Sequence, residues 1–320
     1  MKLSIIVPVY RESKDLDKFF KIIKAQTSKN YEVILIIDTN KNHILDVVEE
    51  HKKNIEKKMQ VIYNSSRIGR SAAVQTGINK AKGAYSIIMS TGDIIRKTFV
   101  EESLEVIDNS KADIIEFKAT FKEPIKFNGR IRLKIPKLVD IHDNLEVVAY
   151  AYAFDFNKLF KSSILKKTTK YNESISINSR FSISNTYRAF AVAKTYSNVS
   201  KSLVISKSKV SINFNPLKII KQWQYLMDTI TISSAYRIFS QEIEYAAFFN
   251  IAIFLFGIVG ASKNSVLLKK LEKSFKSLNQ KEFSAFLESN QYMARKNSES
   301  SFLHIEPRTS FLIKLHKEFK

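Results

Sequence analysis

The stretch LSIIVPVYRESKDLDKFFKIIKAQTSKNYEVILIIDTN, residues 3–40, holds two apolar runs with an amphipathic segment between them. The runs LSIIVPV and YEVILII lack the alternation of a half-exposed strand and are typical of strands buried on both faces of a parallel sheet. Between them, apolar residues recur at helical spacing after Ser13, a residue that can cap a helix. The order strand, helix, strand predicts a βαβ unit.

The same alternation continues to about residue 117. The segments MQVIY (59–63), AYSIIM (84–89) and ADIIEF (112–117) are predicted strands, with amphipathic helices between them. One such helix is expected over residues 69–82, closed by Gly83. The pattern predicts a doubly wound α/β domain, and sheets of this kind bind ligands at the carboxyl ends of their strands.

Farther along the chain the pattern is mixed. RIRLKI (130–135) and the alternating residues 197–214 resemble strands, whereas residues 143–153 and 179–195 are predicted helices. From Pro216 onward the periodicity is helical. We therefore expect an α/β domain over 1–212 and a helical C-terminal region over 213–320.

One segment of this region, YAAFFNIAIFLFGIVGA (245–261), is apolar nearly all round. It is short for a membrane span, so a buried central helix is the preferred interpretation. A contact with a membrane interface is the alternative, because lysines flank the segment.

Composition narrows the function classes. The 320 residues carry a net charge of +21, which favours anionic partners such as sugar nucleotides, nucleic acid or acidic lipids, unless the lysines only solvate the surface. No spacing typical of a nucleic-acid-binding motif is found, so sequence-specific nucleic-acid binding is not predicted. Cysteine is absent and the N-terminus does not resemble a secretory signal, so we expect a cytoplasmic protein, with the inner face of the membrane as a second location.

Five blocks of the chain, in order, resemble a known family. They are IIVPVYRE (5–12), YEVILIIDTN (31–40), SRIGRSAAVQTGINKAKGAYSIIMSTGD (66–93), ADIIEFKATF (112–121) and FNKLFKSSILKK (156–167). Together they resemble the family 2 glycosyltransferases, and the resemblance extends from residue 3 to about 205. It implies a GT-A fold, which is a Rossmann-like, mostly parallel sheet flanked by helices, and a nucleotide-sugar donor.

The resemblance also implies a donor site at the ends of the first strands. Tyr10 and Glu12 follow the first strand and Asp38 follows the second, while Arg67 and Arg70 near a helix start could bind phosphates. The candidate nucleotide-sugar-binding residues are Pro8, Tyr10, Glu12, Asp38, Arg67, Gly69 and Arg70. Each acidic residue could instead cap a helix, and each arginine could be solvated.

Two of the family's acidic motifs are incomplete here. The aspartates of its metal motif fall on Ser90-Thr91-Gly92-Asp93, so Asp93 alone could bind Mg²⁺ or Mn²⁺, unless it is only a turn residue. The first Asp of the second-strand pair is Ile37, and the helical Arg is Val74.

The general base is the third departure. An inverting transferase needs a carboxylate that takes the proton of the acceptor hydroxyl, and the family supplies it where this chain reads SISINSRFSISNTYRAF (174–190). No Asp or Glu occurs between Glu173 and Asp228. The catalytic candidates are therefore Asp93 and Glu173, with Asp155 as a more distant one.

Three functions remain open. The first is a glycosyltransferase that moves a sugar from a nucleotide-diphosphate donor to a lipid or glycan acceptor, with inversion. The second is a catalytically degenerate nucleotide- or sugar-binding module, or a partner subunit, and the third is a scaffolding protein at the membrane surface. Peripheral contact with an anionic membrane is expected for the first and the third.

Overall fold

The computed structural model describes most of the chain. The described residues are 1–9, 13–55, 58–123, 127–168, 182–207, 216–232, 237–255, 266, 269, 270, 273 and 289–295. The candidate residues Tyr10, Glu12 and Glu173 lie outside these ranges.

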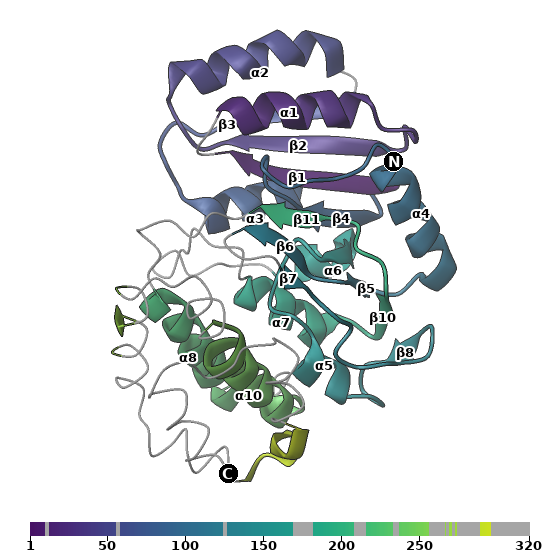
Figure 1. Ribbon diagram of the computed structural model, residues 1–320, viewed down its shortest axis with the longest axis vertical. Helices are drawn as coiled ribbons and strands as arrows, with labels where there is room; N and C mark the ends of the chain where they lie inside the picture. The colour runs from purple at the N-terminus through teal and green to yellow at the C-terminus, as the bar shows by residue number, and fades with distance from the viewer. Residues whose placement is uncertain are drawn as a thin grey trace.

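Within the described residues, the main sheet has eight strands in the order β3-β2-β1-β4-β9-β5-β10-β8 (Figure 1). Their bounds are β1 (Leu3–Val9), β2 (Tyr31–Ile37), β3 (Met59–Tyr63), β4 (Tyr85–Ile88), β5 (Ile114–Phe117), β8 (Val139–Asp140), β9 (Lys158–Lys161) and β10 (Thr195–Val199). Strands β1 to β4 are parallel, and so are β5 and β10. Strand β9 runs antiparallel to both β4 and β5, and β8 runs antiparallel to β10.

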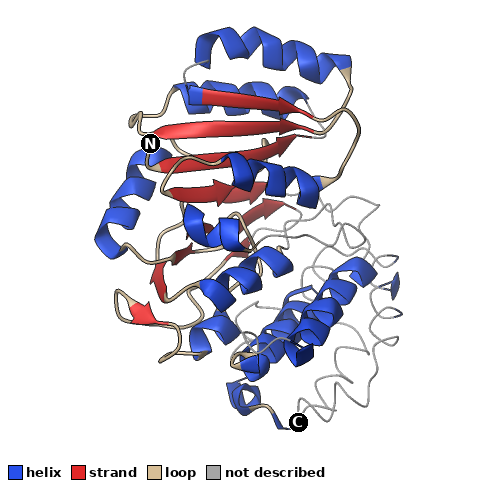
Figure 2. Cartoon of the chain, turned by 180° about the vertical axis from the view of Figure 1, so that it is seen from behind, coloured by secondary structure: helices blue, strands red, loops and turns tan. Residues whose placement is uncertain are grey.

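Helices cover both faces of this sheet, as expected for a doubly wound domain (Figure 2). Their bounds are α1 (Ser13–Lys24), α2 (Asn42–Ile55), α3 (Arg70–Lys80), α4 (Phe99–Ser110), α5 (Glu146–Tyr150), α6 (Ser162–Lys167) and α7 (Ile183–Val192). Ile6 and Ile36 join the core cluster of α3 and α7, whereas Ile5 and Leu35 join that of α1, α2 and α4. Adjacent residues of one strand therefore serve opposite cores, which explains the unbroken apolar runs.

Pro8 interrupts β1 without disturbing the sheet. The amide of Met89 donates to the Ile6 carbonyl at 2.9 Å, so even-numbered residues of β1 direct their backbone groups toward β4. Strand β4 ends at Ile88. Pro8 therefore lies just past the neighbouring strand, where a missing amide costs no ladder bond.

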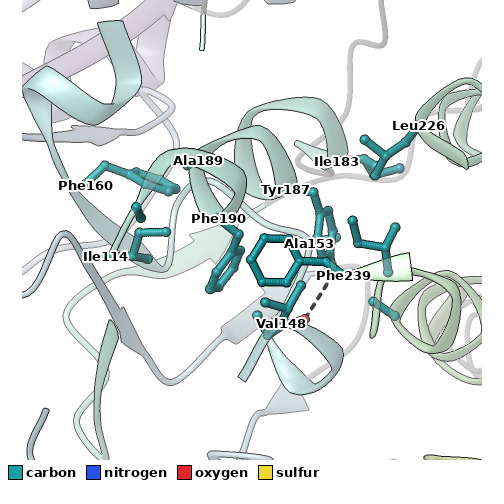
Figure 3. Packing of buried hydrophobic residues seen from close by; sticks show 14 of the residues in the cluster. Ile114, Val148, Ala153, Phe160, Ile183, Tyr187, Ala189, Phe190, Leu226 and Phe239 are labelled. Carbon is teal, nitrogen blue, oxygen red and sulfur yellow. Dashed lines mark hydrogen bonds between the residues drawn. The ribbon is translucent and has the colours of Figure 1, made fainter. Parts of the chain in front are cut away.

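The described C-terminal helices pack against the same core. Helix α8 (Pro216–Ile232) and helix α10 (Ser240–Phe248) lie side by side, at the end of the molecule opposite α2 (Figure 1). Trp223 of α8 is fully buried, and its ring centroid lies 5.0 Å from that of Tyr187 on α7. Figure 3 shows the adjoining packing of α7, where Ile183 and Phe190 face Phe239 and Leu226. Trp223 is thus a core anchor and not an exposed stacking surface.

A small second sheet covers part of the core cluster that contains α1, α2 and α4. It has the order β11-β6-β7 within the described residues, with β6 (Thr120–Glu123), β7 (Phe127–Asn128) and β11 (Ile205–Lys207). Ile94 and Ile205 exchange backbone hydrogen bonds of 2.9 and 3.0 Å, so this sheet is tied to the turn that follows β4.

Several predicted elements differ from those observed. RIRLKI is not a strand, because Arg132 donates to the Tyr150 carbonyl at 3.1 Å and the Leu133 carbonyl accepts from Asn198 at 2.9 Å, so tertiary partners replace a strand ladder. The helix predicted over 143–153 is only α5, and the chain becomes extended at Ala151. The predicted strand over 197–214 is two short strands, and residues 208–215 lie outside the described ranges.

The apolar segment 245–261 is described as far as Leu255. Helix α10 continues into a π-helical turn, Phe249–Leu255, which is a rare conformation usually confined to single turns. Tyr245, Phe248 and Phe254 are buried in the protein core, in agreement with the expected buried helix. Among the described helices, none is both long and apolar enough to cross a membrane.

Candidate active site

Four strands bring candidate residues to one edge of the sheet. Strands β1, β2 and β4 are parallel, so the residues after them share the carboxyl edge. Strand β9 runs in the opposite direction, so the residues that precede it reach the same edge. Asp38, the turn Ser90–Asp93 and Asp155 are therefore neighbours along this edge.

Asp38 holds the loop that leads into α3. Its carboxylate is 1% exposed and accepts hydrogen bonds from Asn64 at 3.1 Å, from the Ile68 amide at 2.8 Å and from the Gly69 amide at 2.8 Å. Gly69 has a φ of 86°, a left-handed conformation that glycine adopts without strain. The carboxylate thus fixes the turn at which α3 begins.

Arg67 and Arg70, at the two ends of this turn, have different environments. Arg67 is exposed, whereas Arg70 is 3% exposed and its Nη2 lies 2.6 Å from Oδ2 of Asp155. Asp155 is fully buried, so the pair is a buried ion pair between α3 and the segment before β9. Arg67 is therefore the more accessible cation for a phosphate, and Arg70 positions Asp155.

The turn after β4 contains the remaining metal candidate. Asp93 is 8% exposed, and its Oδ2 accepts a 2.8 Å hydrogen bond from the Ser90 amide. A Cβ built on Gly92 would lie 3.3 Å from Oδ2 of Asp15, in the first turn of α1, so a second carboxylate is close to the turn. No group of three potential metal ligands occurs among the described residues. Asp93 and Asp15 therefore offer at most two carboxylates, and a divalent cation at this turn would take its other ligands from the phosphates of a nucleotide and from water.

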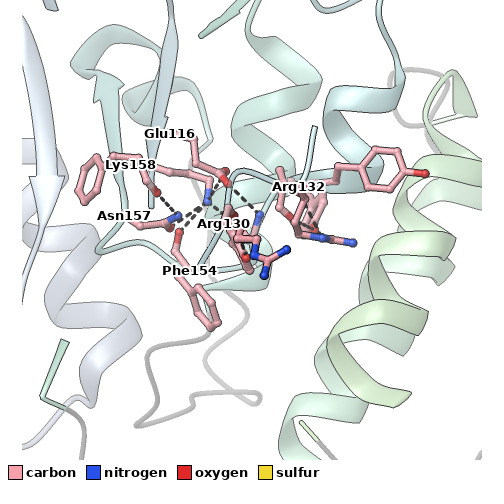
Figure 4. Close-up of polar contacts among 11 residues, drawn as sticks. Glu116, Arg130, Arg132, Phe154, Asn157 and Lys158 are labelled. Atoms are coloured by element: carbon pink, nitrogen blue, oxygen red, sulfur yellow. Dashed lines mark hydrogen bonds and ion pairs between the residues drawn. The ribbon is translucent and has the colours of Figure 1, made fainter. Parts of the chain in front are cut away.

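A second buried ion pair lies at the ends of β5 and β9. Oε2 of Glu116 is 2.9 Å from Nζ of Lys158, and the ammonium also donates to the carbonyls of Tyr152 and Phe154 and to Oδ1 of Asn157 (Figure 4). Burial raises the pKa of Glu116 and lowers that of Lys158, while their mutual attraction opposes both shifts. The pair holds the segment 152–157 against the sheet.

Arg132 extends this polar cluster toward the C-terminal helices. Its guanidinium lies 3.2 Å from the ring centroid of Phe249 and within 5.7 Å of the ring of Tyr152. Such stacking is a favourable environment for arginine. The C-terminal region therefore contacts the segment that leads to Asp155.

Helix α7 also begins at this edge. It precedes β10, which is parallel to β5, and the Ser182 amide donates to the Ala153 carbonyl at 2.8 Å. The described residues of α7 and its start contain no carboxylate. The predicted base Glu173 lies outside the described residues, so its distance to Asp93 and Asp38 is not defined.

Some of these contacts could be anticipated and others could not. The pair Glu116–Lys158 was not predicted, although each is a charged residue within an apolar run, a signal that predicts a buried partner. Asp155 was predicted only as a distant catalytic candidate, because nothing in the sequence links it to Arg70, 85 positions away. Asp15 was not considered, and its position on an amphipathic helix carried no functional signal.

The order and direction of the strands, with helices on both faces, define a GT-A fold. Residues 4–184 match Glycosyl transferase family 2, which is more than half of the chain, and the protein belongs to that family.

Its relatives include both curated proteins and solved structures. Glycosyltransferase GlyA of Streptococcus pneumoniae serotype 4 is 31% identical over 179 residues, covering 52% of this chain and 25% of the relative. The poly(ribitol-phosphate) beta-glucosyltransferase of Bacillus spizizenii is 25% identical over 173 residues, covering 52% and 26%. This chain thus spans about a quarter of the length of these two relatives. The crystal structure of S. aureus TarS 1–349 with UDP-GlcNAc superposes with a TM-score of 0.66 at 15% identity, covering 95% of this chain and 89% of that one.

Proposed function

We propose that this protein is a glycosyltransferase that moves a sugar from a nucleotide-diphosphate donor to a lipid or glycan acceptor, with inversion at the anomeric carbon. The observation that carries the proposal is the gathering of Asp38, Arg70, Asp93 and Asp155 at the carboxyl edge of a family 2 fold. Family 2 relatives named as glycosyltransferases support the reaction class, and the UDP-GlcNAc complex of TarS supports the donor class.

The donor would lie across the strand ends in a defined order. The base and ribose would contact Pro8, Tyr10, Glu12 and Asp38 beside β1 and β2. The diphosphate would approach Arg67, Gly69 and the first amides of α3, because a helix N-terminus favours anions. If Mg²⁺ or Mn²⁺ takes part, Asp93 would bind it, and the cation would offset the charge of the diphosphate.

The acceptor is proposed from charge. A net charge of +21 would attract a lipid-linked or phosphate-bearing glycan, and one curated relative is named for poly(ribitol-phosphate). A lipid-linked acceptor would bring the protein to the inner face of the cytoplasmic membrane, where anionic lipids would hold it peripherally.

The absence of acidic residues between Glu173 and Asp228 supports a second candidate function, a binding module without turnover. General-base catalysis is commonly worth about 10²- to 10⁴-fold in rate. A transferase would therefore have to use Glu173 or another carboxylate at this edge.

A donor screen separates these functions. The melting temperature is measured with UDP, GDP, UDP-GlcNAc, UDP-glucose and GDP-mannose, with and without Mn²⁺, because a ligand that binds only the native state raises stability. Binding followed by release of UDP or GDP in the presence of a lipid or glycan acceptor supports the transferase. Binding without turnover supports the module, and no binding leaves only the scaffolding function.

The variant Asp93→Asn tests the metal. If Asp93 binds the cation, Mn²⁺ should raise the melting temperature of the nucleotide complex in the native protein and not in the variant. An equal Mn²⁺ effect in both proteins would contradict the assignment.

A further inference from the structure

One oxygen of the buried carboxylate Asp155 lacks a partner. Oδ2 accepts the hydrogen bond from Arg70, whereas Oδ1 finds no hydrogen-bond donor among the residues that the structure describes. Asp155 is fully buried, and an unsatisfied buried polar atom is unfavourable and rare in native proteins. An oxygen of this kind at a ligand-binding edge indicates a donor that comes from a ligand.

The position of Asp155 indicates which part of a ligand it meets. The sheet order is β2-β1-β4-β9, so Asp155 lies on the far side of the Ser90–Asp93 turn from Asp38. In a nucleotide sugar, the diphosphate separates the nucleoside from the sugar. With the nucleoside at β1 and β2 and the diphosphate at α3, the sugar falls on the β9 side.

The charge of Asp155 also selects its partner. A carboxylate repels phosphate, so a diphosphate oxygen is excluded as the partner of Oδ1. Hydroxyl groups are the donors that a sugar presents, and a carboxylate held by a guanidinium accepts them in a fixed direction.

We propose that Asp155 is a sugar-recognition residue of the donor site: Oδ1 accepts a hydrogen bond from a hydroxyl of the transferred sugar, and Arg70 fixes the orientation of the carboxylate. This inference rests on the proposed function. Arg70 is a positioning residue in this arrangement, and the pair Glu116–Lys158 supports the segment from which Asp155 projects.

Titration calorimetry with UDP, GDP and their sugar conjugates from the screen above tests the proposal. The measured quantity is the ratio of the Kd of the nucleotide to the Kd of its sugar conjugate, which isolates the sugar. In the variant Asp155→Asn, this ratio should fall about 10- to 100-fold, the range for one hydrogen bond to a charged group, with no change in the Kd of UDP or GDP.

Two further variants keep the test sharp. Asp113→Asn is the matched control, because Asp113 is a nearly buried carboxylate at the opposite edge with partners at Lys161, Lys194 and Thr195, and it should leave the ratio unchanged. The double variant R70M/D155L removes both charges, which avoids an unpaired buried arginine and should preserve folding. Its ratio should be as low as that of Asp155→Asn.

The outcomes are distinguishable. If the ratio is unaltered in both Asp155 variants, or if nucleotide and conjugate lose affinity equally, the residue is structural and the inference is overturned. A variant that keeps its donor affinity and loses only turnover would make Asp155 the base, which also overturns it. If the native protein binds neither nucleotides nor conjugates, the proposed function fails first.

Discussion

Asp38 shows how a single carboxylate can shape a site without facing solvent. Its two oxygens bind both backbone amides of the turn before α3 as well as the Asn64 side chain. Because Gly69 is the N-cap residue of α3, any movement of Asp38 would move the first turn of that helix. The role of Asp38 in nucleotide binding stays a prediction beside this observed structural role.

The substitution Asp38→Asn should therefore cost stability. An amide offers one acceptor oxygen where the carboxylate offers two, so one loop amide loses its partner, at a cost of about 1–3 kcal/mol. Urea unfolding measures the change, and Asp46→Asn on the exposed side of α2 serves as the control, with a change expected within about 0.5 kcal/mol. Equal stability in the two variants would show that the loop does not depend on Asp38.

For single residues, the sequence was informative where a polar side chain directly follows a predicted strand. Asp38 and Asp93 lie at the carboxyl edge as expected, because the carboxyl end of a parallel strand is a predictable place for polar side chains. The pair Arg70–Asp155 was not, because its members are far apart along the chain and neither sits in a periodic pattern. Long-range ion pairs depend on the full topology, which a single sequence does not specify.

Among the elements, α3 approaches the sheet most closely at Gly77. A Cβ there would lie 2.9 Å from Cδ1 of Ile36 and would also overlap Ile6. The backbone of α3 at Gly77 therefore packs directly against the side chains of Ile6 on β1 and Ile36 on β2. This contact places the N-terminus of α3 above the strand ends.

We expect Gly77→Ala to destabilise the protein by about 1–3 kcal/mol, the usual cost of overpacking a core. The exposed variant Asn79→Ala, on the same helix, should be neutral or slightly stabilising, because alanine favours helix. Thermal or urea unfolding compares the two. The pair Gly77→Ala with Ile6→Ala should be less destabilised than the sum of its single variants; strict additivity would contradict a direct clash.

Elements with one clear period were predicted well. Strands β1, β2, β4 and β5 are present because burial on both faces leaves a clear apolar run, and the predicted β3 is present although its residues are only partly buried. Strand β9 was not predicted as a strand, because Asn157 and Lys158 make the sequence at its start polar. Its residues were noted only as part of the block FNKLFKSSILKK. The strand predicted for RIRLKI is absent. Its alternating residues contact a carbonyl group and an aromatic ring, and they do not pair with a neighbouring strand.

At the scale of the whole molecule, the described helices α8 and α10 share a core with the sheet. Trp223, Ile219 and Tyr245 belong to the same buried cluster as Ile6 and Tyr187. The predicted boundary near residue 212 remains a prediction about sequence organisation. Burial across it indicates that the two parts depend on each other.

A fragment of residues 1–212 should therefore not fold as a stable unit. Removing α8 and α10 would expose the apolar surface of α5 and α7, and such surfaces promote aggregation or a loosely packed state. The complete chain should unfold in a single transition, whereas the fragment should bind ANS and lack sharp near-ultraviolet dichroism. A fragment that melts cooperatively would establish an independent domain.

The reversed direction of β9 has a consequence for how this protein could diversify. In a purely parallel sheet, the residues at the carboxyl edge lie in loops that also start a helix. The need to cap that helix restricts which residues can occur there. The approach to β9 has no such constraint, because the chain reaches this strand through bends and a turn and starts no helix there. A preference for one sugar over another could thus be transplanted by exchanging Asp155 together with its partner Arg70, while the fully buried Tyr152, Phe154 and Phe156 of the core stay unchanged.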